Sequence, residues 1–156
     1  MRYLTISPMV RAVLMAFAIL AVVPLPPAVA ATEYDGSYSG IITCDALPGD
    51  KPLRTEFVMK IADGRAQYER EVLQANTTIP AGIAERGSGT VSPSGELVLT
   101  GSAIGPRWRY QATYRGQIAG KTLRLTGAQQ WQLPTSGASH TRPCTIAVSR
   151  SDYVGT

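Results

Sequence analysis

The sequence has 156 residues, with 15 basic and 11 acidic side chains, two cysteines and one histidine. This length suits one domain with a sizeable core. The small excess of positive charge is weak support for an acidic partner, and we expect no nucleic-acid binding. The cysteines are too few and too widely spaced for a zinc site, so we predict no metal and no cofactor.

Residues 1–30 have the pattern of a cleavable secretory signal peptide with an apolar helix. Their only charged side chains are Arg2 and Arg11, and Ala12–Val23 is an uninterrupted apolar run that ends at prolines. A small-x-small cleavage site follows at Ala28–Ala30. A membrane anchor is the alternative, but a spanning helix needs ~20 apolar residues. We therefore predict a periplasmic or secreted protein.

The remaining residues, 31–156, are predicted to form a single all-β domain because their hydrophobic pattern has a period of two. In Leu53–Ile61 and in Arg107–Arg115, apolar and polar side chains alternate, which is typical of strands with one buried face. Gly- and Pro-containing turns separate such segments. The predicted strands are Gly36–Cys44, Leu53–Ile61, Arg65–Leu73, Gly87–Val91, Glu96–Gly101, Arg107–Gly116, Thr122–Gln130 and Cys144–Arg150.

Two segments are harder to interpret from the sequence. Arg65–Leu73 contains good helix formers, but the Asp63-Gly64 pair before it is a hairpin signal and favours a strand. Asn76–Ala84 contains a proline and a glycine, and we interpret it as a long loop at one end of the domain.

The cysteines predict how the sheet closes. Cys44 and Cys144 are an even pair in an exported chain, which favours a disulfide over two free thiols. A disulfide brings its Cα atoms within ~7 Å, so the first and last predicted strands would be neighbours. In an eight-strand up-and-down meander this closes a small barrel. A two-sheet sandwich remains an alternative, whereas the charged outward faces argue against an outer-membrane barrel.

Aromatic side chains supply a candidate ligand-binding lining. Trp108, Tyr110 and Tyr114 share one face of a predicted strand, and Tyr38 is a candidate on another strand. Inside a barrel they could contact a small apolar ligand, or they could simply fill the core. Tyr68 and Trp131 are further candidates for the same lining.

Arginines on the opposite face form a second candidate site. Arg107, Arg109 and Arg115 alternate with the aromatic residues, and Arg124 is predicted on the next strand. Such a stripe could contact an anionic surface. The alternative is an ordinary solvated face, because acidic residues elsewhere nearly balance the charge.

Catalytic motifs are weak in this sequence, and we predict no enzyme. His140 lies in the predicted Pro134–Pro143 loop with two serines, but no nucleophile-elbow motif accompanies it. Two acidic pairs, Asp45 with Asp50 and Glu69 with Glu71, have no predicted cleft.

The chain resembles small exported β-meander proteins of Gram-negative bacteria. The resemblance is carried by the opening Tyr34–Gly40 segment, by Leu-Thr-Gly steps that end predicted strands, and by the final Pro143–Ile146 segment. The layout is also similar to avidin and lipocalin barrels. However, the biotin-binding positions of avidin have no clear counterpart in this chain. The Gly-x-Trp motif that opens lipocalins corresponds here to Gly36-Ser37-Tyr38, which has tyrosine in place of tryptophan. The resemblance implies an exported barrel and no particular activity.

Three functions follow as hypotheses from these observations. The first is a non-catalytic binding module for a small apolar ligand or a protein. The second is a structural or inhibitory protein that acts on another protein through its loops. The third, an enzyme, would require a buried polar cluster around His140.

Overall fold

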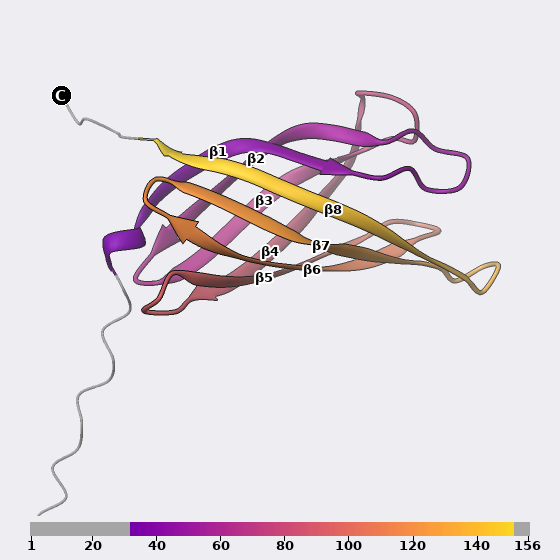
Figure 1. Ribbon diagram of the computed structural model, residues 1–156. Helices are drawn as coiled ribbons and strands as arrows, with labels where there is room; N and C mark the ends of the chain where they lie inside the picture. The colour runs from indigo at the N-terminus through magenta and orange to yellow at the C-terminus, as the bar shows by residue number, and fades with distance from the viewer. Residues whose placement is uncertain (1–31, 152–156) are drawn as a thin grey trace, which may run out of the picture.

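The computed structural model describes residues 32–151, which form a closed antiparallel barrel (Figure 1). The predicted signal segment 1–30 lies outside these residues. Within them, no helix is long and apolar enough to span a membrane. The elements are a short 3-10 helix η1 (Thr32–Tyr34) and the strands β1 (Gly36–Cys44), β2 (Leu53–Ala62), β3 (Arg65–Leu73), β4 (Pro80–Val91), β5 (Glu96–Ile104), β6 (Arg109–Ala119), β7 (Thr122–Leu133) and β8 (Ala138–Ser151).

The strand order confirms the predicted up-and-down meander. Each strand pairs with the next, and β8 pairs with β1, so the barrel has no open edge. The register of this last pair sets Cys44 directly opposite Cys144, with their Cα atoms 4.0 Å apart. The two cysteines form the predicted disulfide, and the sandwich and free-thiol alternatives are wrong.

Alternating burial explains why these segments form strands. In β3, every second residue from Ala66 to Val72 is buried, and the residues between them are exposed. This segment is therefore a strand, as predicted, although its composition suits a helix. The Asp63-Gly64 turn that precedes it has positive φ at both residues (50° and 68°), as a type I′ hairpin requires.

Several strands are longer than predicted. The predicted strand ends at Gly101 and Gln130 are both passed, because β5 continues to Ile104 and β7 to Leu133. Gly101 and Gly127, both inside strands, allow close packing: a Cβ at Gly127 would overlap a backbone carbonyl of β6, and one at Gly101 would overlap the Tyr68 hydroxyl. The strands β4 and β8 begin earlier than predicted, at Pro80 and Ala138, so parts of both predicted loops belong to the sheet.

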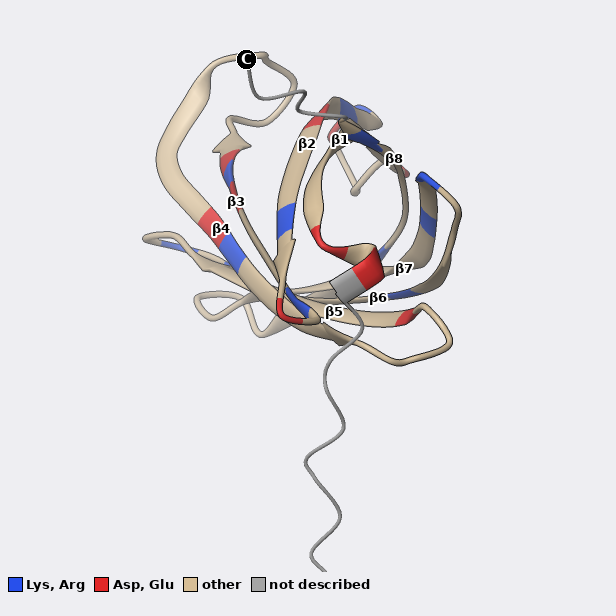
Figure 2. Ribbon diagram, turned by 90° about the vertical axis from the view of Figure 1, so that its left-hand side faces the viewer, with Lys and Arg blue, Asp and Glu red and all other residues tan. Residues whose placement is uncertain are grey.

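The two ends of the barrel differ. At the end where β1 begins and β8 ends, η1 lies across the opening (Figures 1 and 2). The Tyr38 hydroxyl donates to the carbonyl of Tyr34 (2.8 Å), and Arg150 donates to the carbonyl of Glu33 (2.6 Å). Asp35 accepts a hydrogen bond from the backbone of the β2–β3 turn. We call this the closed end, and apolar core residues fill the barrel next to it.

The disulfide joins the two ends of the barrel sequence, and its loss has a predictable cost. Cys44 and Cys144 are separated by 100 positions, so the link removes much of the entropy of the unfolded chain. We expect a double Cys→Ala variant to lose ~2–4 kcal/mol of unfolding free energy. Urea denaturation followed by circular dichroism would measure this change. Unchanged stability would show that the β1–β8 ladder alone holds the barrel closed.

Candidate functional site

The end of the barrel opposite η1 contains a cavity of about 910 Å³. Residues of the β1–β2 and β3–β4 loops contribute to its lining, and Figure 1 shows both loops at the end of the barrel away from η1. These loops are joined where the backbone N–H of Asn76 donates to Asp50 (2.9 Å) and the Asn76 amide donates to the carbonyl of Gly49 (3.1 Å). A bulge in the β3–β4 pairing, between Glu71 and Leu73, lies beside them. The volume falls within the range of small-molecule pockets.

Three aromatic rings form one wall of the cavity. Trp108 is nearly parallel to Tyr110, with ring centroids 5.9 Å apart and an interplanar angle of 16°. Trp131 packs against both rings, at 5.1 Å from Trp108 and 4.4 Å from Tyr110. Tyr110 is buried, whereas both tryptophans are half-buried. The two indoles therefore retain partly exposed surface at the cavity.

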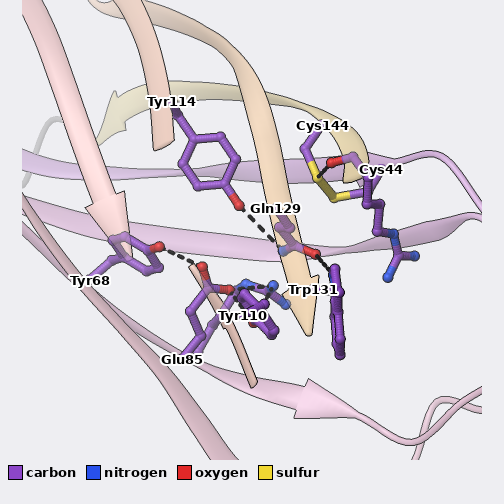
Figure 3. Close-up of polar contacts among 10 residues, drawn as sticks. Cys44, Tyr68, Glu85, Tyr110, Tyr114, Gln129, Trp131 and Cys144 are labelled. Carbon is purple, nitrogen blue, oxygen red and sulfur yellow. Dashed lines mark hydrogen bonds and ion pairs between the residues drawn. A yellow bond between two sulfur atoms is a disulfide. The ribbon is translucent and has the colours of Figure 1, made fainter. Parts of the chain in front are cut away.

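A buried polar cluster lies next to the aromatic wall and is centred on Glu85 (Figure 3). The hydroxyls of Tyr68 and Tyr110 donate to its two carboxylate oxygens, at 2.6 Å and 2.8 Å. Arg70 forms an ion pair with the same carboxylate and also donates to the Tyr110 hydroxyl (3.3 Å). Because buried polar groups are costly unless paired, these contacts fix the position of Glu85.

Two inward-facing glycines make room for this cluster. A Cβ at Gly87 in β4 would overlap the ring of Tyr68, and one at Gly101 in β5 would overlap its hydroxyl. The Tyr68 ring can therefore lie against the neighbouring strands and reach Glu85. The absence of side chains at these positions is a local sequence feature that builds the site.

A glutamine links the aromatic wall to the core. Gln129 is fully buried, accepts a hydrogen bond from the Trp131 indole N–H (3.1 Å) and donates to the Tyr114 hydroxyl (3.3 Å). Since the Trp131 N–H is already paired, this indole offers the cavity an apolar ring surface.

Burial determines the protonation of the tyrosines. Desolvation is the main cause that raises the pKa of Tyr68, Tyr110 and Tyr114 above the usual value of 10.0, and the Glu85 charge acts in the same direction. Desolvation alone would lower the pKa of Arg70, but the charge of Glu85 opposes it and the net shift is upward. At neutral pH the phenols are therefore neutral donors and Arg70 is a cation.

Arg142 is a second buried cation at the cavity. Its Nε donates to the carbonyl of Asp45 (2.7 Å), and a longer bond of 3.5 Å runs from Nη2 to the carbonyl of Lys51. Desolvation lowers its pKa, the Arg70 cation lowers it further, and Asp50 partly opposes both effects. These contacts hold the guanidinium between β8 and the β1–β2 loop.

The four predicted aromatic lining residues separate into two groups. Trp108 and Tyr110 line the cavity, and Trp131, a further candidate, joins them. Tyr114 is fully buried in the main core beside the polar cluster. Tyr38 is fully buried toward the closed end, where it contacts η1. The barrel is therefore filled over part of its length and hollow at the other end.

The predicted arginine stripe lies on the outer wall. Arg107, Arg109, Arg115 and Arg124 are all exposed, and the Arg109 guanidinium donates to the side chain of Gln132 on β7 (2.7 Å). Basic and acidic residues are interspersed around the barrel (Figure 2). This distribution is that of a solvated surface, and contact of the stripe with an anionic surface stays a prediction.

The predicted catalytic candidates do not form a common centre. His140 lies in β8, opposite Trp131, and its half-buried side chain contributes to the cavity wall. The buried polar cluster surrounds Glu85 rather than His140. Glu69 and Glu71 are exposed on the outside of β3. Within residues 32–151, no group of three or more His, Cys, Asp or Glu side chains could hold a metal ion.

Sequence reasoning missed the polar half of the site. The missed residues share buried positions that face inward: Arg70, Glu85, Gln129 and Arg142. Alternation contained a signal for three of them, because Arg70 is in phase with Tyr68, Gln129 with Leu125, and Arg142 with Cys144. Glu85 lies between the predicted loop Asn76–Ala84 and the predicted strand Gly87–Val91, so the direction of its side chain was not predictable.

Comparisons of the chain with protein-family models, with curated proteins and with solved structures found no match.

Proposed function

We propose that the protein is a non-catalytic binding module that holds a small, partly apolar ligand in the open end of its barrel. The observation that carries this proposal is the 910 Å³ cavity with Trp108, Tyr110 and Trp131 on one wall. Half-buried indoles at a concave surface provide a large apolar contact area at a small entropic cost, and aromatic rings of a ligand can stack on them.

The chemistry of the neighbouring polar cluster supports binding rather than catalysis. Glu85 and Arg70 neutralise each other, and the pKa values of the surrounding tyrosines are raised away from neutrality. Such a network positions side chains, and its tyrosines do not exchange protons readily near neutral pH.

We also propose that the protein acts in the periplasm or outside the cell. The signal-like pattern of residues 1–30 supports export. The Cys44–Cys144 disulfide is compatible with it, because such bonds persist mainly in oxidising compartments.

Titration with N-phenyl-1-naphthylamine tests the binding proposal. This neutral aromatic dye fluoresces strongly only in apolar surroundings. We expect saturable binding of one dye per protein, weakened at least about tenfold, or ~1.4 kcal/mol, in a variant that combines Trp108→Ala with Trp131→Ala. Fluorescence titration of both proteins would measure the two dissociation constants.

Ile104→Ala is the matched control for this experiment. Ile104 is 74% exposed and apolar but does not line the cavity, so its loss should leave dye affinity unchanged. Circular dichroism of each variant would confirm an intact barrel. The proposal is wrong if no saturable site is found or if the double tryptophan variant binds like the wild type.

A further inference from the structure

The buried charges near the cavity do not balance. Among residues 32–151, the buried charged side chains are Arg70, Glu85 and Arg142, which carry two positive charges and one negative charge. The ion pairs of this part of the chain are Arg70–Glu85 and Arg86–Glu69. Arg142 forms no ion pair among these residues, although Asp50, which also lines the cavity, acts on it at longer range and raises its pKa.

Isolated buried charge is costly, and backbone carbonyls compensate it only in part. Arg142 has 5% of its surface exposed, and the hydrogen bonds described for it go to carbonyl oxygens. Because Arg142 also lines the cavity, a negative group of a ligand would reach it without having to enter the core.

Arg70 provides a second, independent observation. Its side chain is 93% buried and also lines the cavity, yet its Nε and Nη1 atoms have no hydrogen-bond partner. The ion pair with Glu85 uses Nη2 alone. Unsatisfied guanidinium donors of a residue that lines a cavity indicate a site that is completed by an acceptor, because an unpaired buried donor is costly.

From these contacts we propose that the ligand is a small aromatic anion that bears a carboxylate or similar oxyanion group. This inference rests on the proposed binding function. The negative group lies against the guanidinium of Arg142, and Arg70, whose charge is paired with Glu85, contributes hydrogen-bond donors. The planar guanidinium matches the geometry of an oxyanion.

The aromatic part of the ligand lies against the indole wall. Trp108 and Trp131 supply ring surfaces, and the Trp131 N–H is occupied by Gln129. This wall therefore contributes apolar contact, while Arg142 supplies the charge selection. A neutral analogue should fit the same wall but lose the contact with Arg142.

A pair of dyes separates these contributions. The anionic dye 1-anilinonaphthalene-8-sulfonate is N-phenyl-1-naphthylamine with one added sulfonate. We expect the disulfide-bonded protein to bind the anionic dye at least about tenfold more tightly than the neutral dye, which corresponds to ~1.4 kcal/mol of binding free energy. In Arg142→Gln this preference should fall below about threefold, whereas affinity for the neutral dye should hold.

Two further variants test whether the charge of Arg142 is what matters and whether the dye binds the outer surface. Arg142→Lys keeps the charge and should retain most of the preference for the anion. Arg109→Gln removes an exposed outer-wall charge and should change nothing, which excludes dye binding to the surface. Circular dichroism melting curves would show whether each variant folds, and if Arg142→Gln does not fold, the comparison of the two dyes on the wild-type protein carries the test.

The outcomes distinguish the two proposals. Equal affinities for the two dyes, or a preference that survives in Arg142→Gln, would overturn the anion proposal and leave the binding function standing. If neither dye binds, both proposals are wrong.

Discussion

Replacing Glu85 with glutamine should lower the free energy of unfolding by about 3–5 kcal/mol. The glutamine would keep the shape of the side chain but remove its charge. Arg70, whose side chain is 7% exposed, would then be a buried cation without a partner. The two tyrosine hydroxyls that donate to Glu85 would also lose a charged acceptor. Urea denaturation at neutral pH, followed by circular dichroism, would measure the loss.

The neighbouring pair on the outside of the same strands is the matched control. Register places Glu69 opposite Arg86 and Arg70 opposite Glu85, so β3 and β4 carry two adjacent ion pairs on opposite faces. Arg86 and Glu69 have side chains that are 72% and 58% exposed. Because solvent screens exposed pairs, Glu69→Gln should cost no more than ~1 kcal/mol. Equal effects of Glu69→Gln and Glu85→Gln would contradict the central role of the buried cluster.

The contrast between these two pairs explains what the sequence could predict. Period-two alternation located most of the strands, because one face of each strand packs in the core. The disulfide pairing of Cys44 with Cys144 predicted which strands meet and therefore how the barrel closes. The first inference depends on a rule that holds for any half-buried sheet, and the second depends on the geometry of a disulfide.

The strand ends at the open end were less predictable. Pro80 and Gly82 indicate a loop by composition, yet β4 begins at Pro80 and accommodates the positive φ of Gly82 (69°) in a bulge. The cavity formed by the surrounding loops depends on contacts between distant segments, such as Asn76 with Asp50. No local pattern encodes such contacts.

The polar cluster was not predicted because its residues are of types that usually face solvent. Arg70 and Glu85 are 15 positions apart and become partners only through the register of β3 with β4. Tyr110 was predicted to face inward, but its hydrogen bond to Glu85 requires β4 and β6 to curve around the same interior. Because these contacts join strands that become neighbours only when the barrel closes, this binding site cannot be predicted from the sequence of any one strand.

The buried tyrosines also predict steep alkaline unfolding. Burial and the Glu85 charge raise the pKa of Tyr68, Tyr110 and Tyr114 in the folded protein, whereas in the unfolded chain they ionise near 10.0. Below pH 10 both states keep these protons, so the stabilising contribution is fully present. Above pH 10 the unfolded state loses protons that the folded state retains. The free energy of unfolding should then fall by ~1.4 kcal/mol per pH unit for each tyrosine, or ~4 kcal/mol for all three.

A pH titration from 8 to 12 would test this prediction. Phenolate absorbance at 295 nm should show these tyrosines ionising together with the loss of the circular dichroism signal. Tyr114→Phe removes one phenol from the cluster while keeping its ring, and it should reduce the slope of stability against pH by about a third. Its Gln129 partner loses an acceptor, which lowers stability at neutral pH without adding to the slope. Ionisation of all three phenols in a barrel that keeps its native spectrum would show that the interior admits water and hydroxide freely, and the cluster could not then hold Arg70 and Glu85 as a buried pair.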